Sequence, residues 1–366
     1  MRYDLANLPF SDLLEPVSAA SAVLARLDER VSRSAEGGGW LARSHFFDAC
    51  ASLWVDGELV HVEDLVLHDA GMGVRRPTHE LTIAQDILRT RRRIMANVPD
   101  WALGDDGMRL LRRGGDFDEM QLETKSFSPP SDLFDDEGGD DPLASELAAM
   151  DRVLARSEAV LAAVREPSIP SVSSEREELI YEPDWDENER LAEWRQVLKQ
   201  ADSLPPVVRA TVLLDAWNVL QVLQHAPWLG RLLAVSALRQ SGLAANYLLP
   251  INAGLKQVPR QKRMHRHRDV RLMALIEAMR EAAELGLKEH DRLLLARQQM
   301  QHRLVGRRSS SKLPQLIELL LSRPVVSTSM MVDTLSVTPQ GALKMAGELN
   351  LRELTGRGRF RAWGIL

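Results

Sequence analysis

The stretch LPQLIELLLSRPVVSTSMMVDTLSVTPQGALKMAGELNLRELTGRGRFRAW, residues 313–363, decides the fold of the C-terminal part of the chain. Apolar residues at helical spacing predict a first helix over 313–321, and a second helix follows it. Thr338 then caps a third helix with Pro339 in its first turn, where proline costs no hydrogen bond. Residues 350–364 alternate around a glycine-rich turn, which predicts a two-stranded hairpin.

The order helix, helix, tight turn, helix, hairpin is that of a winged helix-turn-helix. Its third helix, about 10 Å wide, fits the major groove of DNA with its N-terminal residues nearest the bases. Period-two spacing places the arginines of the hairpin on one face, where they can meet phosphates or enter the minor groove. The predicted DNA-binding residues are Thr338, Gln340, Gly341 and Lys344 on the helix, and Arg357, Arg359 and Arg361 on the hairpin.

Charge is distributed unevenly along the 366 residues, whose formal net charge is −6. Residues 303–366 hold ten Lys or Arg against four acids, whereas residues 104–141 hold twelve acids against four bases. A surface that binds nucleic acid must therefore be local. Cys50 is the single cysteine, which excludes a disulfide within the chain and a multi-cysteine zinc site.

No segment predicts a membrane span or a signal peptide, because no apolar run reaches about 18 residues and the N-terminus lacks a basic, then apolar layout. We therefore expect a cytoplasmic protein without a membrane contact. The histidines at 265, 267, 290 and 302 lack the spacing of a metal site, so we expect no metal, and the sequence predicts no cofactor.

The remaining periodicity predicts a mainly α multi-helix bundle. The expected domains are an N-terminal helical region over 1–100, an acidic and partly disordered insert with a helix over 101–180, a helical core over 181–305, and the winged helix over 311–366. Glycines 37–39 are expected to break the chain between helices at 10–33 and 40–54, and residues 104–142 are expected to lack regular structure. The expected helices of the core are 186–201, 205–224, 228–241, 268–286 and 288–304.

Three further groups have alternative interpretations. The basic run at 261–268 is either a phosphate-binding surface or a solvated loop that the chain's own acidic segment neutralises. The arginines at 89–93 are interpreted as an exposed helix face. The tryptophans at 185, 194, 217 and 228 are interpreted as core residues.

Four stretches resemble the Fic family, in its subgroup with an N-terminal helical extension and a C-terminal winged helix. Residues 51–57 and 63–67 resemble the inhibitory helix of that family, which carries Ser or Thr, three residues, Glu, then Gly or Asn. Residues 204–210 resemble the start of its central helix, residues 230–233 the segment after its active loop, and residues 323–357 its winged helix. The whole chain also resembles an uncharacterised family from rhizobial plasmids that joins such a body to a helix-turn-helix.

Active Fic proteins transfer AMP from ATP to a protein hydroxyl, with a histidine as general base and a glycine-rich turn that holds the phosphates. The equivalent region here, residues 224–231, is shorter and lacks the phosphate-binding glycines, the asparagine and the arginine. The resemblance therefore implies a catalytically dead body without catalytic residues. The vestigial positions are Ser52, Asp56, Gly57, His225, Gly230 and Arg231. We expect His225 to be structural, and Ser52 and Asp56 to be helix-end and packing residues whose arginine partner is missing.

The sequence thus favours a double-stranded DNA-binding transcriptional regulator, of a plasmid or mobile element, that works as a homodimer and answers to an unidentified small-molecule or protein signal. Two alternatives stay open. One is a divergent nucleotidyl transferase that uses His225, and the other is an adaptor whose winged helix docks another protein.

Overall fold

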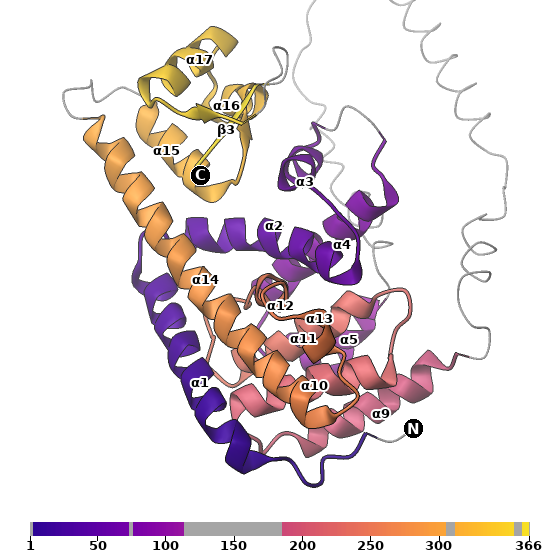
Figure 1. Ribbon diagram of the computed structural model, residues 1–366. Coiled ribbons are helices and arrows are strands. Elements are labelled where there is room, and N and C mark those ends of the chain that lie inside the picture. The colour runs from indigo at the N-terminus through magenta and orange to yellow at the C-terminus, as the bar shows by residue number, and fades with distance from the viewer. Residues whose placement is uncertain (1–2, 73–75, 113–184, 305–311, 355–360, 366) are drawn as a thin grey trace, which may run out of the picture. The chain divides into compact units, whose positions relative to one another are not determined.

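The protein is mainly helical, with a helix-turn-helix at the C-terminal end, as the sequence predicted (Figure 1). The computed structural model describes residues 3–72, 76–112, 185–304, 312–354 and 361–365. The chain divides into two compact units, Met1–Gly115 with Glu187–Leu366, and Asp116–Asp186. The description below concerns the first unit. The helix expected within the insert (residues 144–165) and the acidic segment beyond Arg112 lie outside the described residues.

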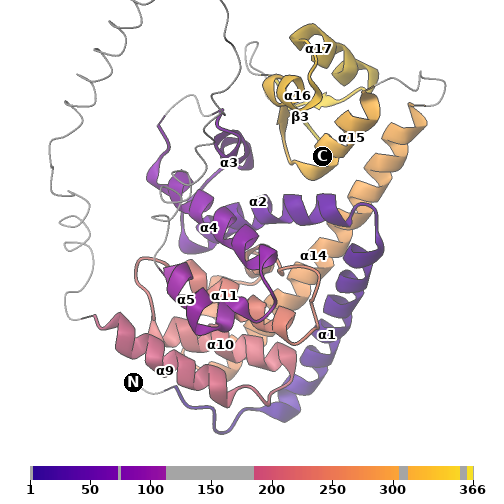
Figure 2. The ribbon, with the colours of Figure 1, turned by 180° about the vertical axis from the view of Figure 1, so that it is seen from behind.

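Two long helices, α1 (Phe10–Arg33) and α14 (Arg268–His302), lie side by side (Figures 1 and 2). α14 is continuous, whereas the sequence predicted two helices that meet near residue 287. A glycine is present at position 286 because neighbouring side chains pack directly against its Cα. A Cβ at this position would lie 2.7 Å from Leu27 Cδ2, and Trp40 Nε1 donates to the Gly286 carbonyl at 2.9 Å.

The glycines at 37–39 do not break the chain but form the first turn of α2 (Gly37–Asp56), which corrects the expectation above. Their missing side chains allow two backbones to approach. A Cβ on Gly37 would lie 1.9 Å from the carbonyl oxygen of Val31, and a Cβ on Gly39 would lie 2.9 Å from that of Leu321. α2 therefore begins where the chain turns back from α1 and meets the C-terminal module.

Four short elements follow α2: α3 (Val62–Asp69), α4 (His79–Ala96), η1 (Trp101–Leu103) and α5 (Asp105–Arg112). α5 falls in the segment that was expected to lack regular structure, so that expectation is wrong for residues 105–112. Its apolar residues Met108 and Leu111 share one face and are buried, while two aspartates in its first turn suit the positive end of the helix dipole.

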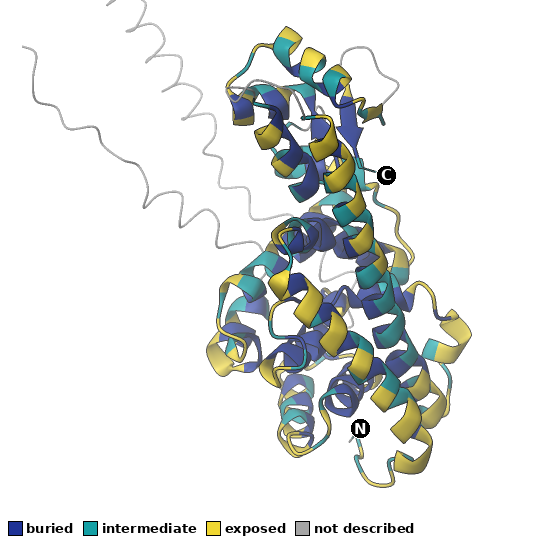
Figure 3. Cartoon of the chain, turned by 90° about the vertical axis from the view of Figure 1, so that its left-hand side faces the viewer, coloured by how far each residue is buried: buried dark blue, intermediate teal, exposed yellow. Residues whose placement is uncertain are grey.

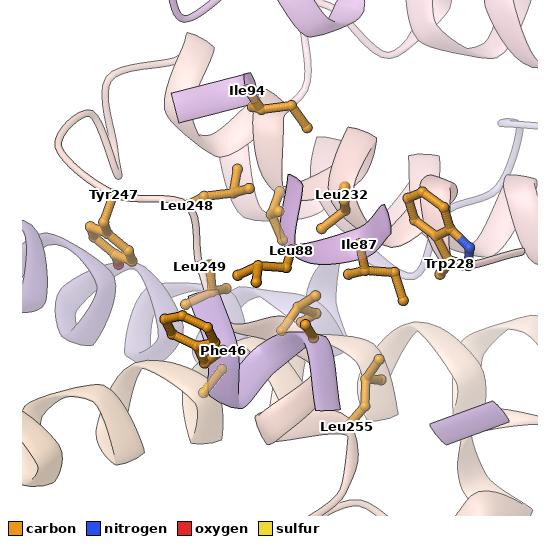
Figure 4. Close-up of a cluster of buried hydrophobic side chains, with 14 of the residues drawn as sticks. Phe46, Ile87, Leu88, Ile94, Trp228, Leu232, Tyr247, Leu248, Leu249 and Leu255 are labelled. Carbon is orange, nitrogen blue, oxygen red and sulfur yellow. The ribbon is translucent and has the colours of Figure 1, made fainter. Parts of the chain in front are cut away.

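The centre of the unit consists of α9 (Glu187–Gln200), α10 (Pro206–Leu220), α11 (Pro227–Gln240), α12 (Ile251–Leu255) and α13 (Arg260–Arg263). α10 is buried on almost every side, which fits a helix whose apolar residues lie on all its faces. Trp194, Trp217 and Trp228 are buried, which confirms their interpretation as core residues, whereas Trp185 is only half-buried. Figure 4 shows part of this core, where Phe46, Leu88, Leu232 and Leu249 lie close together.

One buried ion pair was not expected. Arg91 is fully buried in α4, whereas the sequence predicted an exposed arginine face there. It forms an ion pair with Asp48 and donates to the carbonyl of Leu248 at 2.9 Å. Asp48 also accepts hydrogen bonds from Asn252, through its backbone N–H at 2.8 Å and its side-chain amide at 2.9 Å. The network joins α2, α4 and α12, because a carboxylate at this depth must have partners.

The C-terminal module has the predicted order of elements: α15 (Leu313–Ser322), β1 (Val326–Ser327), α16 (Thr328–Leu335), α17 (Pro339–Glu348), β2 (Arg352–Glu353) and β3 (Ala362–Gly364). The strands form an antiparallel sheet in the order β1-β3-β2, with Trp363 opposite both Val326 and Glu353. The centre of this small sheet is buried, while α17 turns one side to solvent (Figure 3). In the described ranges, no helix has the length and apolar character that crossing a membrane requires.

Candidate nucleic-acid interface

The start of α17 is fixed by local hydrogen bonds. Thr338 Oγ1 accepts the N–H of Gly341 at 3.1 Å, and Pro339 occupies the first helical turn. Ser336 adopts a left-handed conformation with φ 49°, which makes the turn from α16 to α17 tight. The sequence predicted this cap from Thr338 and Pro339. Thr338 and Gly341 therefore have a structural task, and their proposed contact with DNA stays a prediction.

The two faces of α17 differ in character. Ala342 and Ala346 are buried against the module, and Leu349 continues this side just beyond the helix. Gln340 and Lys344 are exposed. Lys344 has no ion pair among the described residues. A capped helix with an apolar inner face and free polar groups outside is the geometry that a recognition helix needs.

The hairpin carries less free charge than its sequence suggested. Arg361 is exposed, but it donates twice to Glu353 Oε2, at 2.9 and 2.7 Å, and its guanidinium lies 5.5 Å from the centre of the Trp363 ring. The hydrogen bonds to Glu353 raise the pKa of Arg361. The predicted sites Arg357 and Arg359 lie outside the described residues.

Two further cations of the module are engaged inside the protein. Lys312 donates to the carbonyl oxygens of Leu335 and Ser336 at the end of α16. Arg323 lies 3.5 Å from a carboxylate oxygen of Asp69, which belongs to α3. Within the described part of the module, Lys344 on α17 and Arg352 in β2 are thus exposed cations without an ion pair.

The module is attached to the helical body through Arg43, a residue of α2 with only 1% of its surface exposed. Its guanidinium donates to the carbonyls of Leu320 at 3.3 Å, Arg323 at 2.7 Å and Ile365 at 3.3 Å. Burial lowers the pKa of Arg43 to about 10, so the group stays charged near neutral pH. Glu289 of α14 lies 3.4 Å from its Nε. One buried arginine therefore joins both ends of the module to the body.

The body brings three of the predicted vestigial positions together. Arg231 in α11 donates to both carboxylate oxygens of Asp56 and, at 2.8 Å, to Ser52 Oγ. The expectation that Asp56 has no arginine to hold is therefore wrong. Gly57 ends α2 in a left-handed conformation with φ 98°, which a glycine adopts without strain.

The other two vestigial positions do not form a phosphate site. His225 is exposed in the turn before α11, and its Nδ1 lies 3.1 Å from Glu187 Oε1. Gly230 is buried inside α11, and a Cβ there would lie 2.1 Å from Trp217 Cγ. The glycine is explained by helix packing. Its N–H lies inside a helix and does not line an open turn.

Comparison with known proteins gives two segment matches and one full-length relative. Residues 179–305 match a family described as a protein of unknown function (DUF1612), and residues 313–366 match an HTH DNA binding domain. The "Uncharacterized protein y4cF" of Sinorhizobium fredii (strain NBRC 101917 / NGR234) is 52% identical over 383 residues, which cover all of both chains. This protein belongs to the y4cF family.

The matches divide this y4cF-family protein at a structural boundary. The DUF1612 match covers α9 to α14, and the DNA-binding match begins at Leu313, the first residue of α15. The protein therefore carries a helix-turn-helix DNA-binding domain after a DUF1612 domain. The matches do not show the Fic resemblance, and the predicted domain boundaries and DNA-contacting residues stay predictions.

Sequence reasoning missed Arg43, the residue that joins the two parts of this y4cF-family protein. The sequence did contain a signal. Arg43, Ser44, His45 and Asp48 are polar residues within a largely apolar helix, and two of them, Arg43 and Asp48, carry a charge. Charged residues within an apolar segment indicate buried pairs. The identity of their partners depends on contacts across more than 200 residues, which periodicity does not reveal.

Proposed function

We propose that this protein is a transcriptional regulator that reads duplex DNA with α17 and whose helical body has no nucleotide-transfer activity. The observation that carries the proposal is the exposed pair Gln340 and Lys344 on a helix that Thr338 caps and that Ala342 and Ala346 anchor. The match of residues 313–366 to an HTH DNA binding domain supports it.

In this proposal α17 enters the major groove by its N-terminal half. The amide of Gln340 can donate to and accept from an adenine edge, and the ammonium of Lys344 can donate to guanine acceptors. Arg361, close to the hairpin turn, contacts phosphate when it leaves Glu353. Two copies bind a two-fold operator, because each α17 reads one half-site, and the spacing of the half-sites reflects the dimer.

DNA binding is tested by fluorescence polarisation with duplex from the region upstream of the gene and with a scrambled duplex of the same composition. We expect the variant Gln340→Ala with Lys344→Ala to bind the upstream duplex at least about tenfold more weakly, since one good base contact contributes about 1–3 kcal/mol. The matched control is Gln315→Ala with Lys288→Ala, which removes the same side-chain types from exposed positions on α15 and α14. Equal losses in both variants, or none in either, would overturn the assignment of α17.

The balanced charges of the hairpin favour a second candidate, in which the winged helix docks another protein. Arg361 is neutralised by Glu353, and Arg323 is paired with Asp69, so the described module presents little net charge. This candidate expects weak duplex binding that barely depends on salt, whereas contacts with phosphates make binding fall steeply as salt rises. A salt titration of the same polarisation assay therefore separates the two.

The proposed inactivity of the body, as a degenerate Fic-like domain, is supported by three features. Gly230 packs against Trp217, the side chain of Arg231 is occupied by Asp56 and Ser52, and His225 pairs with Glu187. Among the described residues, the turn at 224–227 and the start of α11 beside His225 offer no glycine-rich turn that could hold a phosphate. Isothermal titration with millimolar ATP is expected to give no binding heat, and a saturable heat that Arg231→Gln abolishes would contradict this part of the proposal.

A further inference from the structure

The strongest uncompensated charge in the described chain lies far from α17 in sequence, in the segment 256–268, which we call the basic segment. It contains six Lys or Arg and no acid, so 13 residues hold the same excess of six charges that residues 303–366 spread over 64. The segment comprises α13 and the turn into α14. These cations are Lys256, Arg260, Lys262, Arg263, Arg266 and Arg268.

Arginines on the inner side give the basic segment a fixed shape. Arg268 donates to the carbonyls of Asp4, Ala6 and Asn7 at 2.6 to 3.0 Å. Arg271, the next arginine along α14, holds the carbonyls of residues 265 and 266 and the carboxylate of Asp215. These contacts occupy the guanidinium groups of Arg268 and Arg271 and hold the backbone of the basic segment in place. The cations on its outer side therefore lie on an ordered backbone.

The outer cations have no carboxylate partner. Lys256, Arg260 and Arg266 are exposed, and none of them forms an ion pair with a residue that the structure describes. Lys256 lies 5.1 Å from the centre of the Trp54 ring, and Arg266 Nε donates to His267. The neighbouring carboxylate of Asp56 is already held by Arg231.

The positive charges of the basic segment also repel one another. Burial lowers the pKa of Arg263, and the positive charges of Arg231 and Arg260 lower it further. Lys262 differs from the other cations, because it lines an open groove of about 580 Å³ between α1 and α14 together with Asp12, Glu15, Asp269 and Glu277. A polyanion would be repelled on that side, so the contact surface consists of Lys256, Arg260 and Arg266.

We infer that the basic segment binds the phosphate backbone of the duplex that α17 reads, outside the half-site. This rests on the proposed function. A row of exposed cations without a pocket suits a polyanion, and the protein already carries a domain that places duplex DNA on the same compact unit. A contact of this kind adds affinity without base specificity.

The length of α14 determines how long a duplex must be to contact both α17 and the basic segment. The basic segment adjoins its N-terminal end, and Arg303, just past its C-terminal end, donates to the carbonyl of Leu349 at the end of α17 (Figure 1). A helix of 35 residues is about 50 Å long, which corresponds to roughly 15 base pairs. A duplex centred on the half-site must extend that far to one side, so one shorter than roughly 30 base pairs cannot reach the basic segment.

The experiment measures polarisation of two duplexes that share one half-site, of about 14 and about 40 base pairs. The variant is Lys256→Gln, Arg260→Gln and Arg266→Gln. The matched control, Arg26→Gln, Lys199→Gln and Lys288→Gln, removes three exposed cations from α1, α9 and α14 that likewise lack ion pairs. Both variants change the net charge equally, so a general electrostatic effect acts on both.

We expect the basic-segment variant to bind the long duplex at least about tenfold more weakly than the wild type and to lower the slope of log affinity against log salt by about 1 to 3, since each phosphate contact contributes about 0.9. Binding of the short duplex, and binding by the control, stay within about twofold. Equal affinity of variant and wild type for the long duplex overturns the inference and points to an acidic protein partner. If the wild type binds neither duplex, the proposed function fails as well.

Discussion

Residues 303–366, which include the C-terminal module, and the basic segment carry the same excess of positive charge in sequence, yet they present it differently. In the module, Arg361 and Arg323 are paired with Glu353 and Asp69, and Lys344 and Arg352 stay exposed without an ion pair. In the basic segment, the inner arginines bind backbone carbonyls and the outer cations have no carboxylate. A charge count along a sequence therefore does not locate the positive surface of the folded protein.

The comparison suggests a division of labour. The module has polar side chains suited to base edges but little free charge among its described residues, and the basic segment has free charge but no groove-sized helix. The two can act on one duplex only if the joint between module and body is firm. Arg43 is the residue that makes this joint, because its guanidinium is shared between α15, its following turn and the end of the chain.

The largest expected effect comes from breaking this joint with Arg43→Met. Methionine keeps much of the buried apolar contact but leaves three carbonyl oxygens without their donor. We expect a loss of about 2–4 kcal/mol in the free energy of unfolding, because buried acceptors that lose a charged partner are costly. Urea unfolding followed by circular dichroism measures it.

The same variant also tests whether the two surfaces work together. At a temperature where Arg43→Met is still folded, we expect the short duplex to be bound as by the wild type and the preference for the long duplex to be lost. The control Arg26→Met changes an exposed arginine of α1 and should alter neither quantity. A variant that keeps the full preference for long duplex would show that Arg43 stabilises the fold without fixing the geometry of binding.

A smaller effect is expected from releasing charge in the hairpin with Glu353→Gln. The substitution frees Arg361 from its two hydrogen bonds to the carboxylate and leaves an exposed cation beside the turn. One additional phosphate contact should raise the salt slope by about 0.9 and strengthen binding several-fold at low salt. Polarisation titrations between low and moderate salt measure both values.

The matched variant for this prediction is Glu318→Gln, which removes an exposed carboxylate of α15 that pairs with Arg297 of the body. It changes the net charge equally but lies away from the hairpin. If both variants strengthen binding to the same extent, the gain comes from net charge alone and Arg361 has no contact with phosphate.

The sequence predicted the C-terminal module closely because its signals are local. Thr338 and Pro339 mark a helix start that needs only the next three residues, and the structure places a cap at Thr338. For the helix before it the sequence offered Ser327 or Thr328 as the cap, and the structure uses Ser327. The capped third helix and its buried face, with Ala342 and Ala346, were likewise readable from spacing alone. The ion pair of Arg361 with Glu353 could not be predicted, because it depends on the strand register that places Glu353 across the sheet.

The body was predicted less well wherever a residue serves a distant contact. Gly37, Gly39 and Gly286 look like helix breakers, but Val31, Leu321 and Leu27 respectively approach them too closely for a side chain. Arg91 looks like part of an exposed face, but Asp48 holds it in the core. The pair formed by Asp56 and Arg231 joins residues 175 positions apart, and no local pattern indicates it.

The smallest expected effect is a change in the stability of the protein at acid pH, and it involves Asp69. Burial alone would raise its pKa, but hydrogen bonds from Arg92 at 2.7 and 2.9 Å, with help from Gln85 and Arg323, lower it on balance. A carboxyl whose folded pKa is lowered contributes stability above its ordinary pKa, and this stability is lost as the pH falls through the lowered value. Asp69→Asn removes the contribution at every pH.

We therefore expect Asp69→Asn to be less stable than the wild type by about 1 kcal/mol near neutral pH, since Arg92 is partly exposed and its attraction is screened by solvent. The difference should shrink as the pH falls below the ordinary pKa of an aspartate, about 3.9, and through the lowered pKa of Asp69, where the wild-type carboxyl takes up its proton. The control Asp333→Asn, at an exposed position of α16, should show no such convergence. A difference that stays constant down to the acid transition would mean that the ionised carboxylate of Asp69, with its contacts to Arg92 and Arg323, does not contribute to stability.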